Sequence, residues 1–199
     1  TLTKCTTSTG NAAFARGALQ DLVDGQGNNS AFGHEALTDL TGGGFASAFG
    51  FESLHDNTTG QENTCMGYRS GHKITTGGTN TMLGSQAGGG LQTGSENVVI
   101  GRGSCSNSGS TSFGSNVIIG ADTVQGQAFT GSSNVVVGRQ AGYNLSSGSK
   151  NILIGQNAGD INITGDNNII IGQGSDPDTG SRAGAVVLGF EMGTFAGDN

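Results

Sequence analysis

The sequence contains no Trp, a single Pro and few charged residues, and each shortage excludes a class of protein. Charged residues make up 12% of the 199 residues, about half of the ~25% that is typical of soluble domains. One Pro excludes a collagen triple helix, although the chain has 39 Gly. No apolar run approaches the ~18 residues of a membrane-spanning helix. We therefore expect no membrane insertion in this segment.

Basic residues and paired cysteines are also lacking. Eight Lys and Arg residues stand against fifteen acids, so the net charge is −7 and the sequence predicts no nucleic-acid partner. Cys5, Cys65 and Cys105 are odd in number and far apart, which predicts neither a zinc site nor a disulfide framework. No Ser/His/Asp set and no catalytic carboxylate pair stands out. We predict no enzymatic activity and no cofactor.

A short motif recurs from end to end of the chain. Asn97–Gly101 reads Asn-Val-Val-Ile-Gly, and related copies close at residues 15, 33, 50, 67, 84, 101, 120, 138, 155, 172 and 189. Successive copies are 17 to 19 residues apart, mostly 17. Such regularity excludes disorder, which the low hydrophobic content would otherwise favour. We predict one repeat domain over residues 1–199 and, because the chain starts at Thr1, a fragment of a longer fibrous protein.

Each position of the repeat keeps its chemical character. Nine of the eleven copies open with Asn, ten close with Gly, and the residue before the closing position is always large and apolar. A β-branched run followed by Gly is typical of a buried strand that ends in a sharp corner. The pattern predicts an all-β fold, a parallel β-solenoid (β-roll) of eleven coils of about 17 residues. Each coil has room for two strands of roughly five residues and two tight turns, and the Asn residues can bond their own backbone or stack as a ladder.

Both faces of the repeated strand are apolar. In Asn97–Gly101, Val98 and Ile100 point to one face and Val99 to the other. One face can fill the coil, but the other would expose an apolar stripe along the whole rod. We therefore predict a homotrimer, intertwined or side by side, with the chain itself as partner. In this register, Ile154 and Ile171 are expected to be buried, while Arg139 and Gln156 face solvent.

The pattern Asn-x-x-Ile-Gly, followed by a small residue and a Thr-Gly turn, resembles the head repeats of trimeric autotransporter adhesins (the YadA-like head). It is equally similar to repeat arrays in phage and algal-virus tail fibres. The resemblance implies trimers of left-handed parallel β-rolls that present a surface to a host. The adhesin repeat is usually shorter, and the early copies end in Ala13-Phe14, Ala31-Phe32 and Ala48-Phe49 instead of aliphatic pairs. These departures favour the tail-fibre branch.

Three functions remain open at this point. The leading hypothesis is a structural and attachment segment of a trimeric viral tail fibre or spike on the virion surface. Its partners would be a host cell-surface glycan or protein and other virion or fibre proteins. The first alternative is the head of a bacterial adhesin at the cell surface. The second is a Thr-rich solenoid that binds ice or a polysaccharide through the column Thr59, Thr76, Thr93, Ser147 and Thr164.

Candidate binding residues lie in the row that follows the closing Gly. His34, Phe51 and Tyr68 occupy this row in consecutive copies and can form a strip that stacks on sugars. The favoured alternative is that they are surface side chains that steady the solenoid or pack against a neighbouring domain of the fibre. In the next row, Glu52 and Arg69 are expected to form an ion pair between coils.

Two places in the sequence offer side chains that can bind metal ions. His55 and His72 are 17 residues apart and should be neighbours, so they could ligate a metal around a threefold axis, but we identify no carboxylate or Cys that completes the set. The stretch from Asp176 to Gly180, Asp-Pro-Asp-Thr-Gly, offers carboxylates for Ca²⁺, but an Asp-Pro turn is favoured. The sequence therefore predicts no metal site.

Overall fold

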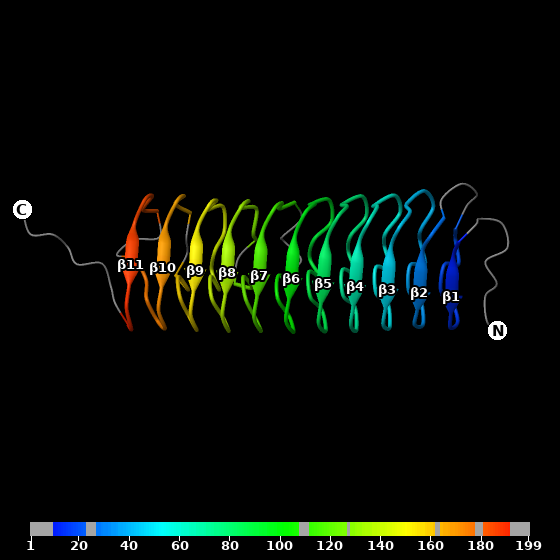
Figure 1. Ribbon diagram of the computed structural model, residues 1–199, viewed down its shortest axis with the longest axis horizontal. Helices are drawn as coiled ribbons and strands as arrows, with labels where there is room; N and C mark the ends of the chain where they lie inside the picture. Colours follow the sequence, from blue (N-terminus) through cyan, green and yellow to red (C-terminus); the bar gives the residue numbers. More distant parts are fainter. Residues whose placement is uncertain are drawn as a thin grey trace, which may run out of the picture.

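The computed structural model describes residues 10–22, 27–107, 112–126, 128–161, 164–177 and 181–191. It confirms an all-β parallel β-solenoid of about ten turns: eleven strands lie side by side in chain order, with β1 and β11 at opposite ends of the rod (Figure 1). None of the described residues forms a helix long and apolar enough to cross a membrane. The strands are β1 (Ala12–Phe14), β2 (Ser30–Phe32), β3 (Ser47–Phe49), β4 (Thr64–Met66), β5 (Thr81–Leu83), β6 (Val98–Ile100), β7 (Val117–Ile119), β8 (Val135–Val137), β9 (Ile152–Ile154), β10 (Ile169–Ile171) and β11 (Val186–Leu188).

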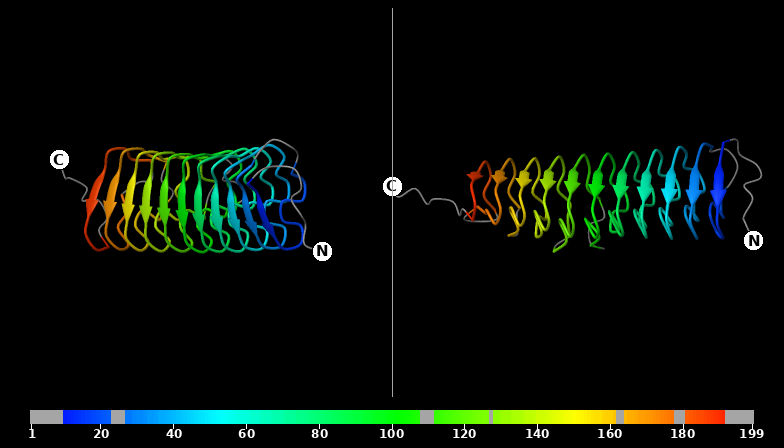
Figure 2. Two further views of the ribbon diagram at one scale, coloured as in Figure 1. Left: turned by 45° about the vertical axis from the view of Figure 1, so that its right-hand side comes forward. Right: turned by 60° about the horizontal axis from the view of Figure 1, so that its bottom comes forward.

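Each coil, numbered here by its strand, contributes one strand of three residues, so the expectation of two five-residue strands was wrong. The strands form one wall of the rod, and turns form the rest of each coil (Figure 2). The reason lies in the backbone after each strand. In coil 3, Glu52 and Leu54 have φ angles of 50° and 52°, and left-handed residues two positions apart cannot continue an extended strand. Backbone hydrogen bonds between coils continue through these turns, for example from Glu52 N–H to His34 O at 2.9 Å.

The closing Gly is required by the stacking of the coils. Gly67 has a φ of 137°, and a Cβ at this position would lie 2.5 Å from the carbonyl oxygen of Gly84 in the next coil. Gly155 has a φ of 135°, with Gly172 O at 2.6 Å from the corresponding point. Any side chain would therefore push the coils apart as well as strain the backbone. This explains why ten of the eleven copies close with Gly.

The middle residue of each strand fills the interior, and the flanking two point outward. Leu153 and Ile170 are fully buried, whereas Ile154 and Ile171 are 36% and 39% exposed. The expectation that Ile154 and Ile171 are buried is therefore wrong for the single chain. The apolar residues that precede the closing positions instead form a continuous row on the outside of the strand wall, called here the outer stripe: Phe14, Phe32, Phe49, Met66, Leu83, Ile100, Ile119, Val137, Ile154, Ile171 and Leu188.

The rest of the interior is built from small residues and from some larger apolar side chains. Leu40, Ile74, Leu91 and Leu145, each seven residues after a closing Gly, are fully buried. In the two longer copies between residues 101 and 138, Phe113 and Phe129 enter the core instead, with ring centroids 5.0 Å apart. Cys65 and Cys105 are free and buried, and burial raises the pKa of the Cys65 thiol to about 12. Both cysteines therefore act as small apolar side chains.

The opening Asn residues form the predicted ladder inside the rod. Asn97 donates through Nδ2 to Asn80 Oδ1 at 2.9 Å, and Asn116 donates through its backbone N–H and Nδ2 to Asn97 Oδ1, both at 3.1 Å. Asn97 and Asn116 are fully buried, and Asn134 is 1% exposed. Each amide links one coil to the next and also binds the loop carbonyl of the following coil, as Asn97 does with Phe113 O at 3.0 Å. The ladder thus satisfies polar backbone groups that the interior would otherwise leave unpaired.

Candidate binding surface of coils 2 to 4

The candidate residues His34, Phe51 and Tyr68 stack on one another, as the repeat spacing implies, and are called here the aromatic strip. The His34 and Phe51 rings lie 5.3 Å apart with planes at 6°, and Phe51 and Tyr68 lie 5.5 Å apart with planes at 13°. Phe51 is 41% exposed and Tyr68 is 47% exposed. The strip therefore presents ring surface to solvent over three consecutive coils.

The turn after each ring separates the exposed strip from the core. Glu35, Glu52 and Arg69 follow the three rings, and their φ angles of 55°, 50° and 52° turn the chain inward. Because of this turn, the residue after Glu52, Ser53, is fully buried and its hydroxyl donates to Cys65 O at 3.1 Å. The geometry of the strip is thus fixed by a repeated backbone turn.

Glu52 is the centre of a polar network beside the strip. The expected ion pair is present, with Arg69 Nε donating to Glu52 Oε2 at 2.6 Å, and His72 Nε2 lies 3.2 Å from the same oxygen. The hydrogen bond from Arg69 lowers the pKa of the Glu52 carboxyl. Arg69 also lies over the Tyr68 ring, 5.4 Å from its centroid. The network therefore joins the aromatic strip to the histidines behind it.

His55 and His72 are stacked neighbours, with ring centroids 5.3 Å apart. A carboxylate does complete this set, contrary to the sequence analysis, because Asp56 Oδ1 lies 2.7 Å from His55 Nδ1. Lys73 Nζ donates to Asp56 Oδ2 at 3.1 Å. The sequence contains a signal for this contact. The pairs His55-Asp56 and His72-Lys73 are 17 residues apart, so the two pairs lie on neighbouring coils and face each other.

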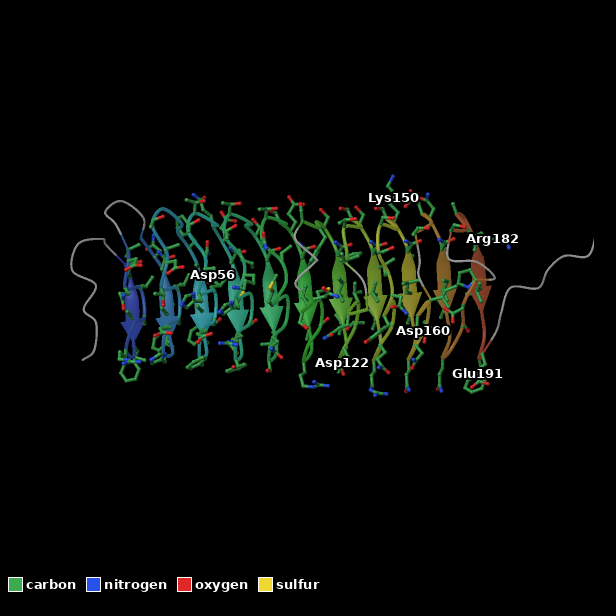
Figure 3. The ribbon with its side chains drawn as sticks, turned by 180° about the vertical axis from the view of Figure 1, so that it is seen from behind. Asp56, Asp122, Lys150, Asp160, Arg182 and Glu191 are labelled. Atoms are coloured by element: carbon green, nitrogen blue, oxygen red, sulfur yellow. The ribbon has the colours of Figure 1, made fainter. Side chains whose placement is uncertain are left out.

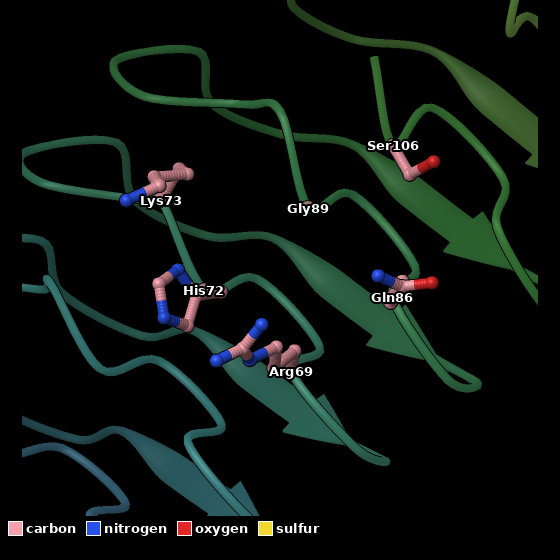
Figure 4. A pocket seen from close by; sticks show the side chains of 6 residues that line it. All are labelled: Arg69, His72, Lys73, Gln86, Gly89 and Ser106. Carbon is pink, nitrogen blue, oxygen red and sulfur yellow. The ribbon is translucent and has the colours of Figure 1, made fainter. Parts of the chain in front are cut away.

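A hollow of about 370 Å³ opens next to this cluster. Figure 4 shows Arg69, His72 and Lys73 on one coil, and Gln86, Gly89 and Ser106 on the coils that follow. The side chains around it are polar or basic, which suits hydroxyl-rich or anionic ligands.

The remaining candidate rows are exposed. Arg139 and Gln156 face solvent as expected, and so do the five members of the Thr column, Thr59, Thr76, Thr93, Ser147 and Thr164. The column is one residue wide. The hydroxyls of the preceding positions, such as Thr58 and Thr75, donate to carbonyl oxygens of the next coil, Thr75 O and Gln92 O, at 3.1 and 3.2 Å.

The Asp-Pro turn lies near the far end of the rod. Asp176 and Pro177 are described, whereas Asp178, Thr179 and Gly180 lie outside the described residues. Burial, followed by the nearby charge of Asp160, raises the pKa of Asp176 to about 6. Figure 3 labels Asp160 and shows that it lies far along the rod from Asp56, the carboxylate beside the histidines. Asp176 therefore keeps its proton to a higher pH than an ordinary Asp does.

We expect Asp176→Asn to stabilise the protein at pH 7, on the order of 1 kcal/mol. The folded-state pKa of about 6 lies above the ordinary 3.8, so the wild-type chain loses stability as pH rises from about 4 through 6. The variant lacks this loss, and its advantage should disappear as pH falls to 4. Urea denaturation at several pH values measures the difference, and an advantage that is independent of pH would contradict this assignment.

The fold and these rows define a parallel β-solenoid repeat protein with an aromatic and polar surface on coils 2 to 4. Comparisons with known proteins add no family: no protein-family model matches the chain, and no curated protein and no solved structure gives a significant match.

Proposed function

We propose that this chain is an attachment segment of a homotrimeric viral tail fibre or spike, and that coils 2 to 4 bind glycans on the host surface. The observation that carries the proposal is the aromatic strip, in which stacked rings remain more than 40% exposed at Phe51 and Tyr68. Aromatic rings with polar edges cover sugar faces at low entropic cost. The polar hollow that begins at Arg69 supplies hydrogen-bond donors beside the rings.

The outer stripe supports the homotrimer. Seven of its eleven side chains are exposed, among them Phe14 at 60%, Leu83 at 42% and Leu188 at 60%. The other four are half-buried: Phe49, Ile100, Ile119 and Val137. A contiguous apolar surface of this kind marks a protein interface, and an uncovered one promotes aggregation. Three chains that bury their stripes against one another would carry three copies of the aromatic strip, so that weak contacts add up to avidity.

The viral setting rests on the resemblance of the repeat to tail-fibre arrays and on the Ala-Phe copies at the start of the chain. An antibody against the chain is expected to label virion tails in electron micrographs. Labelling of a bacterial outer surface instead would assign the segment to the adhesin heads.

We expect the double variant Phe51→Ser/Tyr68→Ser to bind surface glycans at least about 10-fold more weakly than the wild-type chain. An array of immobilised neutral, amino and acidic polysaccharides identifies the ligands, and surface plasmon resonance compares the affinities. Phe190→Ser is the matched control, because Phe190 occupies the same row in coil 11 and is 64% exposed. Undiminished binding by a double variant that keeps the oligomeric state of the wild type, or an equal loss in the control, would contradict the assignment.

A further inference from the structure

Two histidines and two carboxylates gather on coils 3 and 4 behind the aromatic strip. One ligand atom each from His55, Asp56 and His72 lie within 4.8 Å of one another. The imidazoles are stacked with their planes at 13°, so both rings belong to one surface. Glu52 adds a second carboxylate at the edge of the cluster, with its Oε2 3.2 Å from His72 Nε2.

We propose that His55, Asp56 and His72 bind one divalent transition-metal ion, with Zn²⁺ as the expected ion. Two imidazole nitrogens and one carboxylate oxygen, with a fourth position open to water, form a donor set that zinc accepts. Neighbouring ligand atoms around tetrahedral zinc are about 3.3 Å apart, given metal–ligand distances of about 2.0 Å. The three atoms, now within 4.8 Å, reach that spacing through small side-chain rotations. Ca²⁺ takes six or more oxygen ligands, which this cluster does not offer.

The two oxygens of Asp56 have different partners, so an ion bound to Oδ1 need not displace Lys73 from Oδ2. Oδ1 lies 2.7 Å from His55 Nδ1, and a metal ion would take the place of the proton between them. Oδ2 accepts from Lys73, which can stay as an outer partner that orients the carboxylate. The Lys73 side chain is 49% exposed and can also turn toward solvent.

A metal ion at this place would link two coils, because His55 and Asp56 belong to coil 3 and His72 to coil 4. The same two turns carry Phe51 and Tyr68. Metal binding would therefore fix the spacing of the aromatic strip. The proposal does not depend on the attachment function.

Isothermal titration of ZnCl₂ into the full chain, purified without a histidine tag, tests the site. We expect one zinc ion per chain, with an affinity lowered at least about 10-fold in His72→Gln and in Asp56→Asn. His34→Gln is the matched control: His34 is the remaining one of the three histidines and stacks on Phe51 outside the cluster. Its affinity for zinc should equal that of the wild-type chain. Co²⁺ in place of zinc should give the visible absorption of a tetrahedral site, and only when His72 and Asp56 are both present.

Thermal melting separates binding from folding. Without metal, the variants should melt as single cooperative species, and added zinc should raise the melting temperature of the wild type and of His34→Gln by more than that of His72→Gln and Asp56→Asn. The proposal is overturned if the wild-type chain takes up no zinc, or if all variants bind it equally.

Discussion

Replacing Asn168 by Asp is expected to lower the free energy of unfolding by about 3 kcal/mol or more, since it buries an uncompensated charge. Asn168 is fully buried at the ladder position of coil 10. Its Nδ2 donates to Asn151 Oδ1 at 3.0 Å and to Arg182 O at 2.9 Å. In the variant, a carboxylate oxygen would face the acceptors Asn151 Oδ1 and Arg182 O, and it would have no hydrogen to donate to them.

Asn167 provides a matched control one residue away. It is exposed and has a φ of 61°, a conformation that Asp also tolerates. Asn167→Asp adds the same charge to the same turn, so its stability should stay within about 0.5 kcal/mol of the wild type. Urea denaturation followed by circular dichroism compares the two variants. Equal losses in both would show that net charge, and not the ladder, sets the stability of this region.

The Asn168→Asp deficit should also depend on pH. Burial raises the pKa of a carboxyl, and a protonated Asp regains one donor. The deficit should therefore shrink as the pH is lowered toward 4. A deficit that stays constant would mean that the loss comes from packing alone.

Replacing Ile154 by Asp is expected to separate the proposed homotrimer into folded single chains. The wild-type particle should have a mass of roughly 60 kDa, three times the 19.8 kDa of the chain. Ile154 belongs to the outer stripe and is 36% exposed in the single chain, so a charge there can remain hydrated once the chains part. Light scattering should report 19.8 kDa for the variant with an unchanged circular dichroism spectrum.

A substitution at the neighbouring residue, Leu153, distinguishes a loss of assembly from a loss of folding. Leu153 is fully buried inside the coil, so Leu153→Asp should unfold the chain around coil 9. Gln156→Asp, exposed and outside the stripe, should leave both mass and stability unchanged. A wild-type chain that stays monomeric at micromolar concentration, or an Ile154→Asp variant that stays trimeric, would contradict the outer stripe as the seam.

The repeat spacing was sufficient to predict which residues meet across coils. Parallel strands in register place residues 17 apart side by side, so the pairing of Glu52 with Arg69 and the stacking of His55 on His72 followed from counting. The Asn ladder followed in the same way. The same spacing also places His55-Asp56 opposite His72-Lys73, so Asp56 could have been included, but only the structure shows that the turn directs its carboxylate toward the histidines.

The sequence by itself determined the architecture, because the opening Asn, the apolar strand and the closing Gly recur about every 17 residues and therefore stack in register from coil to coil. Gly at the corner and Asn at the strand start are required by contacts that recur in most coils. The tertiary structure decided which apolar face is inside. Leu153 and Ile154 have the same hydrophobic character, and only the left-handed turn after the strand sets which of them points inward. It also decided how the longer copies fill their core, since Phe113 and Phe129 enter from loop positions that the repeat does not specify.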